Sequence, residues 1–222
     1  MWSSGSSRLV PLAGRPRALR LGFDLKPGMR VGLYGGSFNP AHEGHAHVAR
    51  TAQVRLGLDR VIWLVSPQNP LKTSRPASTR ERAAAVRQLA DGPATIVSDL
   101  ERRLGATYTI DVIHILQARY PGVKFVWLMG GDNLASFHRW KGWADIMRTV
   151  PVAVVARPGF TLKALLSVAA RRFSSARRPA AQAKMLADLR PPAWAYLPAP
   201  LHFASSTALR GSPSRVADEK PS

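Results

Sequence analysis

Short runs of apolar residues recur along the chain, and stretches with apolar positions at every third or fourth residue separate them. The runs do not alternate with polar residues, which is typical of parallel strands buried on both faces. Six runs are predicted to be strands: residues 29–34, 60–66, 95–98, 123–129, 150–156 and 194–197. Helical spacing is found over residues 44–56, 79–89, 109–116 and 160–190, with a short helix after residue 205. This order predicts an α/β fold with one doubly wound parallel sheet.

A glycine-rich stretch with two histidines joins the first predicted strand to the first helix. Its sequence is Gly35-Gly36-Ser37-Phe38-Asn39-Pro40-Ala41-His42-Glu43-Gly44-His45. Glycines let backbone N–H groups approach a ligand, and the helix N-terminus that follows favours phosphate. His42 and His45 are three residues apart and share one helix face, where they could hydrogen-bond to phosphate or, when protonated, neutralise its charge. The alternative is an ordinary turn with surface histidines.

Further polar residues follow the carboxyl ends of other predicted strands, where open α/β sheets bind ligands. The second strand ends in Pro67-Gln68-Asn69-Pro70-Leu71-Lys72, an extended loop in which Lys72 is a candidate phosphate contact. The fourth strand ends in Gly130-Gly131-Asp132-Asn133, where the carboxylate of Asp132 is placed to accept a hydrogen bond from a ribose hydroxyl. The alternative is an ordinary turn aspartate. These residues are predicted to form one site with the glycine–histidine stretch.

Two later helix starts carry hydroxyl groups. Thr107-Tyr108-Thr109 opens one helix, and Ser205-Ser206-Thr207 is predicted to cap the last one, with Arg210 one turn on. The second arrangement could clamp a triphosphate, although locally a routine N-cap with a surface arginine is the simpler interpretation.

The charge of the chain is strongly positive. The formal net charge is +19, and residues 1–30 and 157–190 supply +5 and +7 of it. Such an excess attracts polyanions, but neither segment interleaves aromatic residues with its arginines as single-strand binders do. The charge is therefore interpreted as the mark of a basic, arginine-rich proteome combined with attraction for anionic nucleotides, and no specific nucleic-acid partner is expected.

Composition also bears on location and domain organisation. The 222 residues include no cysteine, which excludes disulfides and thiolate metal sites and is compatible with the cytoplasm. No apolar run reaches the ~20 residues that span a bilayer, so no membrane association is expected. Residues 1–27 are predicted to be a basic, disordered extension, residues 28–210 a single domain, and residues 211–222 a flexible tail. The pattern leaves open whether copies of the chain form a homo-oligomer.

The glycine–histidine stretch resembles the HxGH signature of the nucleotidyltransferase superfamily. Its fuller form, GGSFNPxHxGH, is similar to the bacterial nicotinate-nucleotide adenylyltransferase family. The segments 67–72, 129–134 and 205–210 also resemble elements of that family, and the resemblance covers roughly residues 29–210. It implies a Rossmann-like nucleotidyltransferase fold.

The resemblance also implies an activity and a set of roles. The reaction would be adenylyl transfer from ATP to nicotinate mononucleotide in NAD biosynthesis, giving deamido-NAD and pyrophosphate. Mg²⁺ would be bound mainly through the ATP phosphates, with no protein side chain as a metal ligand. The residues implied to act in catalysis are His42, His45, Lys72 and Arg210. The residues implied to bind ATP are Gly35, Gly36, Ser37, Phe38, Asn39, His42, His45, Gly130, Asp132, Ser205, Ser206, Thr207 and Arg210.

The acceptor is the second substrate that the resemblance implies. The resemblance implies that Thr107, Tyr108, Trp140 and Lys72 bind nicotinate mononucleotide, and a flat pyridine ring suits stacking on an indole. Trp140 is chosen over Trp143 by its place in the motif, and its alternative role is packing. Other acceptors on the same fold, nicotinamide mononucleotide or pantetheine phosphate, are alternatives, as is a basic nucleic-acid-binding protein on this scaffold.

Overall fold

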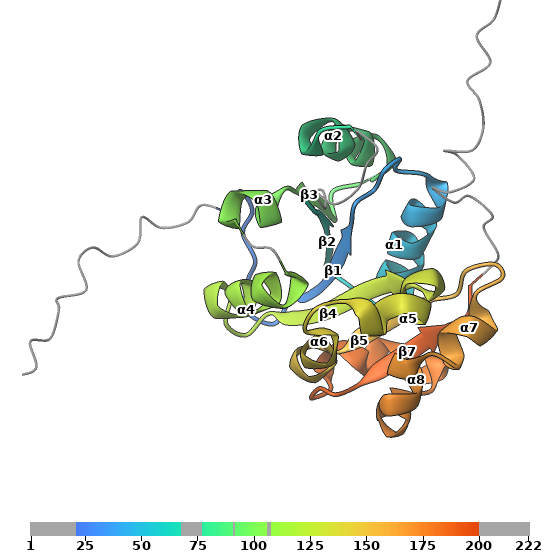
Figure 1. The fold of residues 1–222 in the computed structure, drawn as a ribbon. Coiled ribbons are helices and arrows are strands. Elements are labelled where there is room, and N and C mark those ends of the chain that lie inside the picture. Colours follow the sequence, from blue (N-terminus) through green and yellow to red (C-terminus); the bar gives the residue numbers. More distant parts are fainter. Residues whose placement is uncertain (1–20, 68–76, 91, 106–107, 200–222) are drawn as a thin grey trace, which may run out of the picture.

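The computed structural model describes residues 21–67, 77–90, 92–105 and 108–199. They form three layers, with a central sheet between two layers of helices (Figure 1). Every strand pairing is parallel, and the strand order is β3-β2-β1-β4-β5-β7-β6. The strands are β1 (Arg30–Gly36), β2 (Arg60–Val65), β3 (Thr95–Ser98), β4 (Lys124–Gly130), β5 (Val152–Val155), β6 (Arg177–Arg178) and β7 (Trp194–Leu197). The predicted doubly wound parallel sheet is confirmed.

Helices connect these strands. They are α1 (Glu43–Leu56), α2 (Thr79–Leu89), α3 (Leu100–Leu104), α4 (Thr109–Arg119), α5 (Gly131–Ser136), α6 (Trp143–Thr149), α7 (Thr161–Leu165) and α8 (Val168–Arg172). The predicted helices over residues 44–56, 79–89 and 109–116 are found as α1, α2 and α4. Short 3₁₀ segments follow as η1 (Phe137–Arg139), η2 (Ser174–Ala176) and η3 (Ala180–Asp188). Gly57 ends α1 in the left-handed conformation, and Ser78 caps α2 in a reciprocal bond pair with Glu81.

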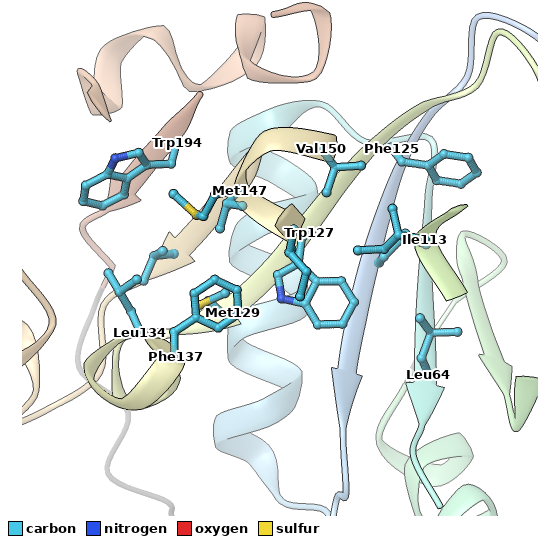
Figure 2. Packing of buried hydrophobic residues seen from close by; sticks show 14 of the residues in the cluster. Leu64, Ile113, Phe125, Trp127, Met129, Leu134, Phe137, Met147, Val150 and Trp194 are labelled. Carbon is cyan, nitrogen blue, oxygen red and sulfur yellow. The ribbon is translucent and has the colours of Figure 1, made fainter. Parts of the chain in front are cut away.

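Each central strand sends alternate side chains to opposite faces of the sheet and so fills two cores. On β4, Phe125, Trp127 and Met129 enter the core that α4, α5 and α6 cover (Figure 2). Val126 and Leu128 enter the opposite core, beneath α1, α2 and η3. Burial on both faces explains why the strands appear in the sequence as continuous apolar runs.

The strand order reverses direction between β1 and β4. From β1 the chain builds outward through β2 and β3, whereas β4 leads to β5, β7 and β6 on the other side. Gly36 and Gly130, the last residues of β1 and β4, therefore lie at the topological switch point of the sheet. Ligands of open α/β sheets bind outside the carboxyl ends of the strands at such a point.

The structure differs from the sequence predictions in four places. The continuous helix predicted over residues 160–190 is wrong, because that segment forms α7, α8, η2, the edge strand β6 and η3. Gly35 and Gly36 belong to β1 instead of the turn, and residues 100–104, for which no helix was predicted, form α3. Residues 21–27, assigned to the extension, pack on the domain, since Leu21 and Leu25 are buried.

Within the described parts of the chain, every helix is too short or too polar to cross a membrane.

Candidate active site

The end of β1 is shaped by aromatic rings that occupy the space beside its glycines. A Cβ at Gly35 would collide with the indole of Trp127, and a Cβ at Gly36 would lie 3.1 Å from the ring of Phe38. Phe38 is buried and has a left-handed backbone (φ 46°). Its ring packs edge-on against Tyr34 and His45, with centroids 5.4 and 5.1 Å apart. The two glycines are thus needed for packing that fixes the turn, in addition to any ligand contact.

The two histidines lie at the start of α1, as predicted. His42 is the N-cap residue and is 5% exposed, and its ring lies 3.8 Å from that of His45 between centroids. The backbone N–H of His42 donates a hydrogen bond to Nδ1 of His45 at 3.3 Å. Because Nδ1 accepts this bond, the proton of a neutral His45 is carried by Nε2.

The surroundings of His45 keep its ring neutral. Burial, with smaller contributions from the charges of His42 and Arg157, lowers the pKa of His45 to about 3. At neutral pH the side chain therefore offers an Nε2–H donor and carries no charge. Of the two roles considered from the sequence, hydrogen bonding fits the free protein and a permanent positive charge on His45 does not.

The fixed positive charge beside His45 comes from Arg157, which the sequence did not single out as a site residue. Arg157 follows β5 by two positions and is 7% exposed. Its Nε lies 3.8 Å from Oδ1 of Asp132, and its charge acts on His45. The signal available in the sequence was a lone arginine at a strand end, before Pro158 and Gly159.

Asp132 lies in the first turn of α5, directly after β4. A Cβ added at Gly130 would collide with Oδ1 of Asp132, so any larger residue at 130 would displace the carboxylate. The side chain of Asp132 is 39% exposed. His42, His45, Asp132 and Arg157, called here the histidine cluster, therefore combine ring donors, a guanidinium and a carboxylate at the switch point.

A second group lies on the α4–α6 side of the sheet. Tyr108, the N-cap of α4, is 38% exposed, and Nζ of Lys141 lies 4.4 Å from the centroid of its ring. Trp140 packs edge-on against Phe137 and Trp127, with centroids 5.3 and 6.3 Å apart. Tyr108, Trp140 and Lys141 are called here the aromatic cluster.

Trp127 connects the two clusters. Its indole fills the space beside Gly35, at the end of the strand that leads to His42, and also contacts Trp140. Trp143, the rejected alternative to Trp140, instead packs on Phe173 of the 168–173 region at 5.9 Å and lies beneath Arg172. Trp140 is thus the tryptophan of this pair that is linked through Trp127 to the end of β1.

Several predicted site residues lie outside the described residues. These are Lys72, Thr107, Ser205, Ser206, Thr207 and Arg210. Ser37 and Asn39, which are described, lie between β1 and α1 beside Phe38. Over the described ranges there is no group of three or more His, Cys, Asp or Glu side chains that could hold a metal ion.

Comparison with known proteins gives consistent matches. A cytidylyltransferase-like family model matches residues 33–212. A probable nicotinate-nucleotide adenylyltransferase of Caulobacter sp. (strain K31) is 67% identical over 186 residues, covering 82% of this chain and 97% of the relative. Probable enzymes of the same name from Cereibacter sphaeroides (strain ATCC 17025 / ATH 2.4.3) and Parvibaculum lavamentivorans are 54% and 52% identical, covering 83% and 84% of this chain and 98% and 93% of the relatives.

Solved structures agree on the fold. The Plasmodium falciparum nicotinic acid mononucleotide adenylyltransferase complexed with NaAD matches with a TM-score of 0.59 and 14% sequence identity, over 82% of both chains. At this identity the match supports the fold alone. Because the family model spans most of the chain and the relatives match over nearly their whole length, this chain belongs to the cytidylyltransferase-like family, among its nicotinate-nucleotide adenylyltransferase members.

Proposed function

We propose that this protein transfers the adenylyl group of ATP to nicotinate mononucleotide, giving deamido-NAD and pyrophosphate in NAD biosynthesis. The observation that carries the proposal is the histidine cluster at the switch point of the sheet, linked through Trp127 to the aromatic cluster. The names of relatives up to 67% identical support the same activity. The cytoplasm is the proposed location, without a membrane or a specific nucleic-acid partner.

The histidine cluster is assigned to ATP. Nε2–H of neutral His45 would donate to a phosphate oxygen, and the buried guanidinium of Arg157 would supply fixed positive charge. Asp132 would accept a hydrogen bond from a ribose hydroxyl. His42, Gly36, Ser37 and Asn39 would complete the phosphate surroundings.

The reaction requires no protein nucleophile. A 5′-phosphate oxygen of nicotinate mononucleotide attacks the α-phosphorus of ATP and forms the new P–O bond. The bond from the α-phosphorus to its bridging oxygen breaks, and that electron pair leaves with pyrophosphate. The protein therefore acts by positioning two anions in line and stabilising the negative charge that develops between them.

Mg²⁺ is proposed to enter with ATP. The ion would be held mainly by phosphate oxygens and water, with no protein side chain as a ligand. When bound, the ion offsets charge on the phosphates.

The aromatic cluster is assigned to the acceptor. The ring of Trp140 offers a face for the pyridine, and Tyr108 stands at the helix start whose backbone donors suit a carboxylate. Thr107 and Lys72 are proposed to act with them, although both lie outside the described residues.

A panel of acceptors tests the proposal. Purified protein with ATP and Mg²⁺ is given nicotinate mononucleotide, nicotinamide mononucleotide or pantetheine phosphate, and pyrophosphate release is measured. The acid mononucleotide should give the highest kcat/KM. Pyrophosphate release at background with this acceptor would overturn the proposal, and preference for another acceptor would keep the chemistry and change the substrate.

A further inference from the structure

A second buried arginine, Arg82 on α2, lies outside both clusters. Its side chain is only 3% exposed, and burial lowers the pKa of its guanidinium. A guanidinium withdrawn from water to this extent is tolerated only where its N–H groups find partners.

Those partners are backbone oxygens from three different segments. Nη1 donates to the carbonyl of Ser37, Nη2 to the carbonyl of Ser66 at 2.9 Å, and Nε to the carbonyl of Ala77 at 3.1 Å. Ser37 follows β1, Ser66 follows β2, and Ala77 precedes the N-cap of α2. A single side chain thus joins the exits of two neighbouring strands to the start of a helix.

The nearest counter-charge does not replace these bonds. Glu101 on α3 is 7% exposed, and burial raises its pKa to about 7, against the opposing influence of Arg82. Among the described residues, no ion pair within 4.0 Å joins Glu101 to Arg82. The carbonyl oxygens, together with Oγ1 of Thr79 at 3.1 Å, are therefore what holds the guanidinium.

The hydrogen bond from Arg82 to Ser37 is connected to the histidine cluster through Phe38. Ser37 precedes Phe38, whose left-handed backbone sets the ring that packs against His45 at 5.1 Å. The N–H of Ser66 also donates to the carbonyl of Gly36 at 3.0 Å, so the two strand exits are coupled directly as well. A displacement at Ser37 would therefore move Phe38 and, with it, the ring of His45.

We propose that Arg82 is a positioning residue for the nucleotidyl transfer: its three carbonyl bonds hold the turn between β1 and α1 so that His45 meets the phosphates. The inference rests on the proposed function for its kinetic consequence, but the structural part stands without it.

The kinetic test uses Arg82→Met, which removes every donor, and Arg82→Lys, which keeps the charge and loses the planar fork. Arg80→Met, an exposed arginine of the same helix, is the matched control. Arg82→Met should lower kcat by about 10²-fold, the scale of a small misplacement of reacting groups, with the acceptor KM within about twofold of wild type. Guanidine added to Arg82→Ala should restore part of the rate, whereas methylammonium should not.

A readout that is independent of substrate separates this inference from the proposed function. Amide hydrogen exchange over residues 36–45 should be on the order of tenfold faster in Arg82→Met than in wild type. The exchange rates of β4 and β5 should not change in this variant, and Arg80→Met should exchange at the wild-type rate over residues 36–45. If wild type transfers no adenylyl group to any acceptor, the proposed function fails and the exchange result still decides the role of Arg82.

Three outcomes would overturn the inference. One is a folded Arg82→Met variant with wild-type exchange over residues 36–45. Another is a kcat within about twofold of wild type. The third is loss of the folded state in both Arg82→Met and Arg82→Lys, which would make Arg82 a residue of general stability.

Discussion

The histidine cluster and the aromatic cluster are built in different ways. In the histidine cluster, His42 and Arg157 are buried, and a backbone hydrogen bond fixes the orientation of His45. In the aromatic cluster, Tyr108 is 38% exposed, and its contact with Lys141 is a cation–π interaction, which is less directional than a hydrogen bond.

This difference matches the demands of the proposed reaction. Charge develops at the phosphorus, where preorganised donors act most strongly and movement is most costly. Acceptor choice depends on a ring and a carboxylate, which an exposed surface can bind with weaker contacts. Changes in the histidine cluster should therefore reduce kcat, and changes in the aromatic cluster should alter KM and selectivity.

The largest effect is expected at His45. His45→Ala removes the Nε2–H donor that the bond from His42 orients, and kcat should fall by about 10²-fold or more. Initial rates of pyrophosphate release measure this loss, with His114→Ala, an exposed histidine of α4, as the control. A near-normal rate in His45→Ala would remove the distinction between the two clusters.

The buried, neutral ring of His45 should make the folded protein less stable in acid. Its folded-state pKa of about 3 is below the ordinary value of 6.5, so between these values the unfolded chain binds a proton that the folded chain excludes. The free energy of unfolding should therefore decrease as pH falls below about 6.5, by up to about 1.4 kcal/mol per pH unit. Urea unfolding at pH 7 and pH 5 should show a steeper loss for wild type than for His45→Gln. Equal losses would mean that His45 titrates normally.

Trp140 should affect binding of the acceptor more than the rate. Trp140→Ala removes the proposed stacking surface and should raise the KM for nicotinate mononucleotide about tenfold, with the KM for ATP unchanged. Trp143→Ala is the control, because Trp143 packs on Phe137 and Phe173, and among the described residues no ring contact joins it to Trp127. If Trp143→Ala raises the acceptor KM and Trp140→Ala does not, the assignment must be exchanged.

Lys141 should give the smallest effect, on selectivity. Its exposed ammonium beside Tyr108 favours an acceptor with a carboxylate, so Lys141→Met should lower the acid-to-amide ratio of kcat/KM by roughly 2–5-fold. Lys163→Met is a matched control, since Nζ of Lys163 on α7 lies 5.9 Å from the centroid of the ring of Phe160. Equal losses for both acceptors would show that Lys141 only steadies Tyr108.

Most of the sheet could be predicted because its strands are buried on both faces. Continuous apolar runs such as 60–66 and 123–129 are typical of strands in a parallel sheet that helices cover on both faces. The glycine–histidine stretch was also identifiable, because its residue types and its place between a strand and a helix agree. The pairing of His45 with a backbone N–H was not, since it depends on side-chain orientation.

Local helix breaks and tertiary contacts together explain the failed predictions. Residues 160–190 are rich in alanine, which favours helix, but Ser167 caps a new helix and Pro179 cannot continue one. Arg177 and Arg178 pair with β7 as an edge strand, which local propensity does not predict. Arg157 was counted only as charge, because the pairing of β4 with β5 is what brings it beside Asp132.

The central claim is that the two clusters form one site for two nucleotides. A crystal structure of the protein with a non-hydrolysable ATP analogue and nicotinate mononucleotide tests it most directly. We predict a phosphate oxygen within about 3.2 Å of Nε2 of His45, the ribose at Asp132 and the pyridine ring against Trp140. Either ligand bound on a face of the molecule away from these residues would contradict the account.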